Sequence, residues 1–232
     1  MTKENLEEYL DPTDFLDFHR KRVKKKALEI TEGLTSDKEK VSALFYWVRD
    51  AIKYNAFSYF PQVKSNLKAS TTIRRMYGFC MSKAVTLSAL ARAVDIPARI
   101  HMVDIVNHKV SQRIVDLMGT NVFHCHGYSE ILLDEEWVKL TPVFDHETSM
   151  KGGFLPEIEF DGEHDAMFEK YDKDGNLFVE YVKDWGVYSD VPIKKIDKIF
   201  RKNYPKWYND NPDFSSVNVQ KTAKKEPLSL DK

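Results

Sequence analysis

The sequence predicts an α+β fold, with helices in the first part of the chain and an antiparallel sheet after them. Up to about residue 95, apolar residues recur mainly at helical spacing. From Ala98 onward the period changes, and short runs of strand type follow, two of them joined near Asp134 and Glu135. Helices followed by a β-meander are typical of α+β folds rather than of alternating βαβ units.

Two helices have clear start or stop signals. The run Thr35-Ser36-Asp37 is a cap before a segment with one apolar face, and a second helix is predicted from Cys80 until Pro97 forbids its continuation. The apolar face of the first helix consists of Val41, Leu44, Phe45, Val48 and Ile52. The strands are predicted at 98–106, 126–133 and 136–144, with a polar excursion or short helix over 107–121.

We expect one domain with extensions, because 232 residues are long for one ordinary domain but short for two. Residues 1–35 are polar and are predicted to form an N-terminal helical extension. Residues 36–205 are predicted to form the core with a C-terminal elaboration, which after residue 146 is aromatic-rich and irregular. The polar segment 206–232 is predicted to be a poorly ordered tail.

Composition excludes several classes of partner. The 36 acidic and 35 basic residues nearly cancel, which argues against nucleic acid as a partner because that binding rests on a basic surplus. No apolar run approaches the roughly 18 residues of a membrane span, and the N-terminus lacks the apolar core of a signal peptide. The two cysteines give no disulfide framework. We therefore expect a cytoplasmic protein without nucleic-acid or membrane partners.

Cys80 is a candidate nucleophile because of its place at a predicted helix start. A helix N-terminus lowers the pKa of a thiol through its unpaired N–H groups, and the same groups can stabilise an oxyanion. Gly78, two residues earlier, permits a tight approach of the chain. The alternative is that Cys80 is a small buried apolar residue, as free cysteines often are.

A thiolate nucleophile needs a base, normally a histidine. Of the seven histidines, His124 and His126 stand out because they open a predicted strand. Side-chain alternation predicts that both face one way and that Cys125 faces the other. A metal site at His-Cys-His is the alternative, but no CxxC or HxxxH partner accompanies it, and we expect neither metal nor cofactor.

These segments together resemble the transglutaminase-like core. The resemblance is carried by Gly-x-Cys with KAVTLSALARAVDIPAR after it, by HGYSE at 126–130 and by EWVKL at 136–140, within about residues 41–145. It implies a papain-like fold in which the nucleophile helix packs on an antiparallel β-sheet. Carried over residue by residue, it makes Cys80 the nucleophile and His126 the base.

The third member of the site departs from the family pattern. Trp-x-x-x-Asp-Pro would place a carboxylate at position 141, where this chain has Thr141. If the hairpin pairs residues whose numbers sum to about 269, Val143 lies opposite His126, with Thr141 and Asp145 as its diagonal neighbours. Asp145 could then orient the imidazole, Thr141 could fix its tautomer, or neither could act.

The resemblance implies thiol chemistry on a protein or peptide substrate through a thioester intermediate. Hydrolysis would make the protein a cysteine protease or amidase, and transfer to an amine would make it a transglutaminase-type acyltransferase. A catalytically inactive binding or scaffold module is the third alternative. Tyr54 or Tyr77 is a candidate oxyanion donor, and the sequence makes no prediction about oligomeric state.

Overall fold

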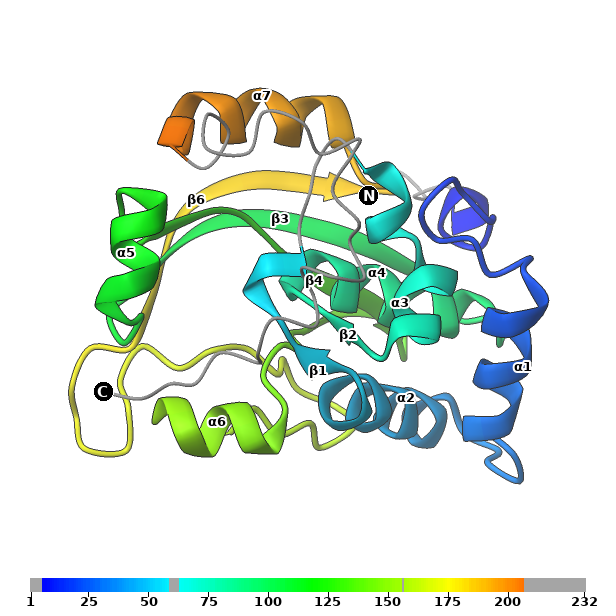
Figure 1. Ribbon diagram of the computed structural model, residues 1–232. Coiled ribbons are helices and arrows are strands. Elements are labelled where there is room, and N and C mark those ends of the chain that lie inside the picture. The colour runs from blue at the N-terminus through cyan, green and yellow to red at the C-terminus, as the bar shows by residue number, and fades with distance from the viewer. Residues whose placement is uncertain (1–5, 59–62, 156, 207–232) are drawn as a thin grey trace.

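A computed structural model describes residues 6–58, 63–155 and 157–206 of the chain (Figure 1). A four-stranded antiparallel sheet has the strand order β5-β4-β3-β6, and short β1 and β2 form a separate parallel pair. The helices are α1 (Lys21–Ile30), α2 (Asp37–Ala51), α3 (Ala69–Arg75), α4 (Cys80–Arg92), α5 (Gln112–Met118), α6 (His146–Gly152) and α7 (Ile193–Asn203). The strands are β1 (Lys53–Tyr54), β2 (Tyr77–Gly78), β3 (Ala98–Asn107), β4 (Val122–Leu133), β5 (Glu136–Leu140) and β6 (Val179–Tyr188).

The α+β prediction is confirmed, and so is the signal that begins α2. Ser36 caps that helix: its hydroxyl accepts the backbone N–H of Glu39, while the Glu39 side chain bonds back to Ser36. The five apolar residues predicted for one face of α2 are all fully buried. They pack in the same core cluster as α4, together with Val23 and Ala27 of α1.

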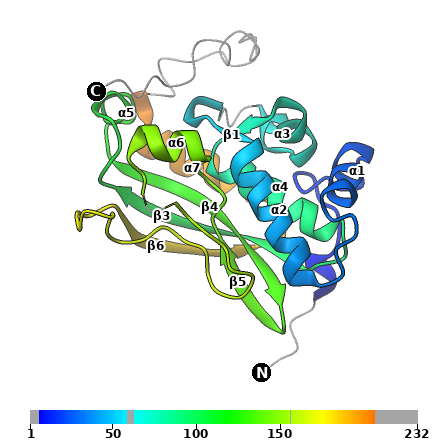
Figure 2. The ribbon, with the colours of Figure 1, turned by 90° about the horizontal axis from the view of Figure 1, so that it is seen from below.

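Helix α4 is the centre of the fold. It packs against α1, α2 and α3 and against strands β3 and β4 (Figure 2). Every residue from Met81 to Arg92 is buried, whereas Cys80 at its N-terminus keeps part of its surface open. A helix enclosed on all sides cannot have a polar solvent face, which explains the alanine-rich, apolar composition of this segment.

Gly127 allows the first turn of α4 to approach β4 closely. A Cβ atom at this position would lie 2.7 Å from both Sδ and Cε of Met81 and 3.2 Å from its Cα. Contacts of 2.7 Å are essentially never found for a Cβ atom, so a side chain at this position would force Met81 to move. Because Gly127 follows His126 and Met81 follows Cys80, the same contact brings the two candidate catalytic residues to one place.

The hairpin of β4 and β5 has the predicted register, with Ser129 opposite Leu140 and Leu133 opposite Glu136. The second strand is shorter than predicted, because it ends at Leu140 instead of continuing to residue 144. The N–H of Thr141 donates to the carbonyl of Ala166, so the chain leaves β4 for another segment.

Residues 146–205 are more regular than the sequence indicates. Strand β6 pairs antiparallel with β3 over its length, and α6 and α7 also lie in this segment. Most side chains of β6 are exposed or half-buried, so its sequence lacks the alternation that identifies a strand. The tail predicted for 206–232 lies, except for residue 206, outside the described residues.

No helix in the described parts of the chain combines the length and the apolar character that a membrane span requires.

Replacing Gly127 with Ala should destabilise the protein by about 1–3 kcal/mol, because the new methyl group overpacks the contact between α4 and β4. The free energy of unfolding, measured by urea denaturation, tests this expectation. The same substitution in a Met81→Ala background should cost less, since the clashing side-chain atoms are then absent. An equal cost in both backgrounds would contradict the proposed clash.

Candidate active site

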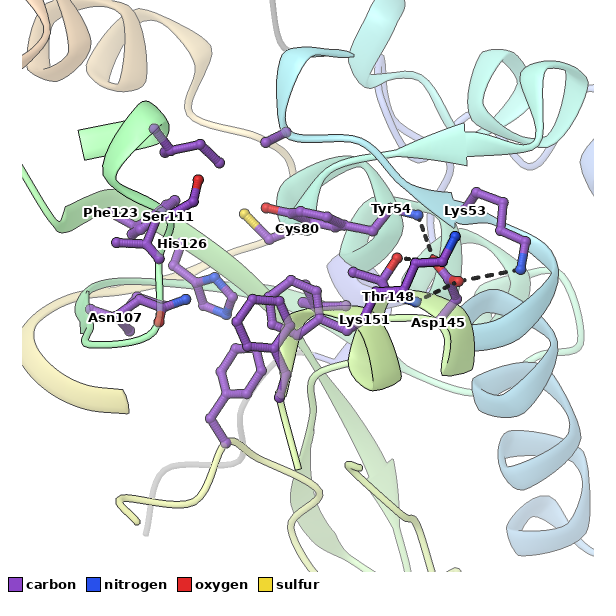
Figure 3. A pocket seen from close by; sticks show the side chains of 18 of the residues that line it. Lys53, Tyr54, Cys80, Asn107, Ser111, Phe123, His126, Asp145, Thr148 and Lys151 are labelled. Carbon is purple, nitrogen blue, oxygen red and sulfur yellow. Dashed lines mark hydrogen bonds and ion pairs between the residues drawn. The ribbon is translucent and has the colours of Figure 1, made fainter. Parts of the chain in front are cut away.

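Cys80 and His126 line the same cavity, whose volume is about 630 Å³. Figure 3 shows the thiol and the imidazole inside it, with residues from β1, β3, α4, β4, α5 and α6 around them. The two side chains come from segments 46 positions apart in the sequence, and the packing of α4 on β4 brings them together.

The position of Cys80 follows from the turn that precedes α4. The Ser82 hydroxyl accepts the N–H of Phe79 at 2.9 Å and donates to the Phe79 carbonyl at 3.0 Å, which closes the first turn. Beside it, β2 pairs with β1, and the N–H of Asn55 donates to the Gly78 carbonyl. Cys80 therefore begins α4 next to the end of β1, where Tyr54 lies.

Burial outweighs the helix N-terminus in setting the state of the thiol. Desolvation raises the pKa of Cys80 to about 11, although the backbone N–H groups of Gly127, Met81 and Cys80 itself favour the thiolate. The sequence predicts the opposite direction from the helix N-terminus alone. The difference arises because the loss of hydration destabilises the thiolate more than the few backbone N–H groups stabilise it.

His126 is neutral for the same reason. Its side chain is almost fully buried, its ring packs against Phe168 with centroids 5.6 Å apart, and burial lowers its pKa to about 3. Its Nε2 atom is buried and has no hydrogen-bond partner in the described part of the structure. A buried polar atom without a hydrogen-bond partner lowers the stability of the folded protein, unless a ligand supplies the partner. His126 lines the cavity, where a ligand would bind.

A β-bulge separates the two histidines of β4. Cys125 has φ 58°, and the pairing of β3 with β4 shifts between Val103 and Ile105. The predicted regular alternation is therefore wrong at this point. The Nδ1 of His124 lies 2.9 Å from the carboxylate of Asp104, which also accepts the N–H of Cys125.

His124, one of the two histidines of the metal alternative, has a hydrogen-bond partner in Asp104. The described parts of the chain contain no group of three or more His, Cys, Asp or Glu side chains that could hold a metal ion.

Asp145 lies in the cavity wall, but its carboxylate bonds to other groups than His126. It accepts the N–H of Tyr54 at 2.9 Å, the hydroxyl of Thr148 at 2.8 Å and the ammonium group of Lys53 at 3.2 Å (Figure 3). Burial opposes its charge, yet these bonds outweigh the burial and hold the pKa of Asp145 below its usual value. The aspartate thus joins β1 to the N-terminus of α6, which it caps.

Thr141 is fully buried, and its hydroxyl contacts the sulfur of Met167 at 3.1 Å. It does not belong to the described residues that line the cavity. The structure therefore brings Cys80, His126 and Asp145 to one cavity and leaves Thr141 behind its wall.

Of the two candidate oxyanion donors, Tyr54 lines the cavity and Tyr77 does not. Figure 3 shows the Tyr54 hydroxyl directed toward the Cys80 thiol. The Tyr54 ring packs edge-on against Phe144, and burial raises the pKa of its hydroxyl, so the group keeps its proton.

Two polar residues of the cavity escape sequence analysis. Asn107 ends β3 and Ser111 precedes α5, and both line the cavity wall. They lie in a stretch that the sequence marks only as a polar excursion, and neither belongs to a recognisable motif.

The model of the Transglutaminase-like superfamily matches residues 24–142 of the chain, about half of its length. No curated protein matches it.

Solved structures that are similar to the chain include the following three. A proposed cysteine protease from Cytophaga hutchinsonii is 21% identical, with a TM-score of 0.47, over 64% of this chain and 44% of that one. A proposed protease from Parabacteroides distasonis is 15% identical, with a TM-score of 0.38, over 59% and 25%. A TGase is 14% identical, with a TM-score of 0.37, over 64% and 35%. The chain spans less than half the length of each.

The raised pKa of Cys80 predicts slow alkylation at neutral pH. Because the thiolate is the reactive form, and its fraction grows only as the pH rises toward about 11, iodoacetamide should react with Cys80 more slowly at pH 7.5 than with a small free thiol. The expected difference is about two orders of magnitude. A Cys125→Ala background leaves one thiol, so that intact mass reports the rate.

A rate that instead levels off at a pH well below about 8.5, the ordinary pKa of a thiol, would contradict this expectation. It would indicate a thiolate–imidazolium pair in the free protein.

Proposed function

The chain belongs to the Transglutaminase-like superfamily, and on that premise we propose that it is a thiol enzyme that hydrolyses amide or peptide bonds of a protein or peptide substrate. The observation that supports this most directly is the shared cavity of Cys80 and His126, in which the Nε2 of the histidine is buried without a partner. A nucleophile and an unpartnered base in one cavity are the minimum for acyl transfer.

In the first half-reaction, the Cys80 sulfur attacks the substrate carbonyl carbon. The thiol proton passes to the neutral imidazole of His126. Because burial disfavours both the thiolate and the imidazolium, the proton moves as the carbon–sulfur bond forms and not before it. The imidazolium then protonates the leaving amine, the C–N bond breaks, and a thioester on Cys80 remains.

In the second half-reaction, the now neutral His126 removes a proton from water, which attacks the thioester. The C–S bond breaks, the proton returns to the sulfur, and a carboxylic acid leaves. One histidine serves as base and acid in turn, as microscopic reversibility requires.

The negative charge that develops on the carbonyl oxygen needs donors. The N–H groups of Cys80 and Met81 lie in the first turn of α4, where a helix offers no internal acceptor. The Tyr54 hydroxyl, directed toward the thiol, would supply a side-chain donor. The raised pKa of Tyr54 keeps this donor protonated throughout the accessible pH range.

Asp145 is a stronger candidate than Thr141 for the third residue of the active site. Its contacts, however, support a role other than orienting the imidazole of His126. Its carboxylate accepts the Tyr54 N–H and thereby fixes the residue that faces the thiol. We assign it a positioning role through Tyr54. Thr141, whose hydroxyl is engaged with Met167, is the weaker candidate.

Water is the preferred acceptor, because nothing in the sequence suggests the specialised tunnel that an amine acceptor needs when water must be excluded. Amine transfer and an inactive binding module are the alternatives. The identity of the product separates them from hydrolysis.

The proposed nucleophile predicts a covalent intermediate. With an activated peptide ester, rapid acid quenching and intact-mass measurement should show one acyl group on Cys80, and the free acid should accumulate as product. Cys80→Ala should lose the adduct, Cys125→Ala should keep it, and His126→Gln should lower kcat about 10²–10⁴-fold.

An adduct of equal yield in Cys80→Ala would remove the nucleophile assignment. Addition of a primary diamine tests the acceptor: a stable amide in place of the acid would replace hydrolysis by amine transfer. If a broad panel of esters and amides gave neither adduct nor product, the inactive binding module would be the remaining alternative.

A positioning role for Asp145 predicts that Asp145→Asn lowers kcat by at least about tenfold, because Tyr54 loses its fixed place as a donor. The KM and the pH dependence of kcat should change little. The matched variant Thr141→Val should retain kcat within about twofold, since its hydroxyl does not face the cavity. A displaced pH profile in Asp145→Asn would instead indicate that the carboxylate acts on His126.

A further inference from the structure

One wall of the cavity is aromatic and reaches His126 directly. Phe168 packs on the imidazole, and the ring of Phe144 lies 5.4 Å from that of Phe168. Phe154 stacks on Phe144 with centroids 4.3 Å apart. These three rings line the cavity and form a continuous apolar surface that begins at the candidate base.

A further part of the wall is apolar as well. Val110, Ile114 and Phe123 contribute to it from the region of α5 and the start of β4. A cavity of about 630 Å³ lies within the range of about 300–1,000 Å³ that is typical of small-ligand pockets. It has room for a large side chain together with the atoms of the scissile bond.

The charged groups in the wall are paired with one another. The ammonium group of Lys151 lies 2.6 Å from the Glu147 carboxylate. That of Lys53 lies 3.2 Å from Asp145 and 3.9 Å from Glu147. The two lysines and two acids among the described lining residues thus compensate each other, and the wall carries no charge surplus that would attract an ionic side chain.

Two polar residues, Asn107 and Ser111, interrupt the apolar surface on the α5 side. The side-chain oxygen of Asn107 accepts the N–H of Lys109. The Ser111 hydroxyl oxygen is buried and has no hydrogen-bond partner among the described residues. Figure 3 shows Ser111 on the same side of the cavity as the Cys80 thiol. The Ser111 hydroxyl can bond one substrate group, and the Asn107 oxygen is already engaged by Lys109. The two residues therefore offer a carboxamide side chain only part of the pairing that its oxygen and its NH₂ group require.

From these walls we propose that the cavity binds a large apolar side chain, above all an aromatic one, on the residue that supplies the acyl group. Glutamine and charged side chains are disfavoured there, because their polar ends would lose water without gaining full pairing. This inference rests on the proposed thiol function and names the substrate class of the same site.

Covalent peptidyl probes test the preference directly. In a peptidyl acyloxymethyl ketone, the Cys80 thiolate displaces the carboxylate from the methylene carbon and forms a stable thioether. Five probes that differ only in the residue before the ketone, namely Phe, Leu, Ala, Gln and Lys, are reacted with the whole protein in a Cys125→Ala background. The second-order rate of adduct formation should be highest for Phe and then Leu, and at least about tenfold lower for Gln and Lys.

A cavity-filling variant checks that the preference arises from this cavity. Val110→Trp should lower the rate of the Phe probe at least about tenfold while the Ala probe stays within about twofold. The matched control is Val182→Trp, which adds the same side chain at an exposed position of β6 outside the cavity wall. It should change neither rate. The ranking of the five probes on the protein with native Val110 tests the proposal even if Val110→Trp does not fold.

The outcomes distinguish a failure of the proposed substrate class from a failure of the proposed thiol function. Equal rates for the five probes, or a fastest rate with Gln or Lys, would overturn the apolar substrate class and leave the thiol function intact. Labelling of unfolded but not of folded protein by every probe would overturn both.

Discussion

The burial of α4 on all sides is the constraint on which the rest of this structure depends. A helix that contacts both the sheet and three other helices needs a close approach on every face and a partner for every polar group it carries into the core. Gly127 provides the approach on the sheet side. The fully buried amino group of Lys83 donates to the carbonyls of Arg49 and Ile52 at the end of α2 and so serves as a helix cap.

Arg92, the last residue of α4, is a second buried polar side chain with partners. Its guanidinium donates to the carbonyls of Asp11, Ala98 and Ser189, which ties the N-terminal segment, the start of β3 and the segment after β6 to one buried side chain. Cys80, the first residue of α4, lies where the helix meets the cavity that His126 also lines.

The same burial determines the chemistry that this point can perform. It raises the pKa of the thiol and lowers that of His126, so both groups are neutral in the free protein. In the proposed mechanism, charge separation then occurs only as the sulfur attacks a substrate carbonyl, which would couple reactivity to binding. The family model ends at residue 142, whereas Phe144, Phe154 and Phe168 follow it. The candidate catalytic pair thus lies in the part that the family model matches, and the aromatic wall lies after it.

The sequence by itself determined the features that depend on short-range patterns. These are the α+β order of elements, the capped start of α2, the place of Cys80 at the first position of α4 and the register of β4 with β5. Tertiary structure decided the bulge at Cys125, the early end of β5, the pairing of β6 with β3 and the partners of Asp145. It also reversed the expected direction of the Cys80 pKa. Local sequence encodes hydrogen bonds between near neighbours and the period of apolar residues, but desolvation and long-range partners arise only when segments distant in the sequence pack together.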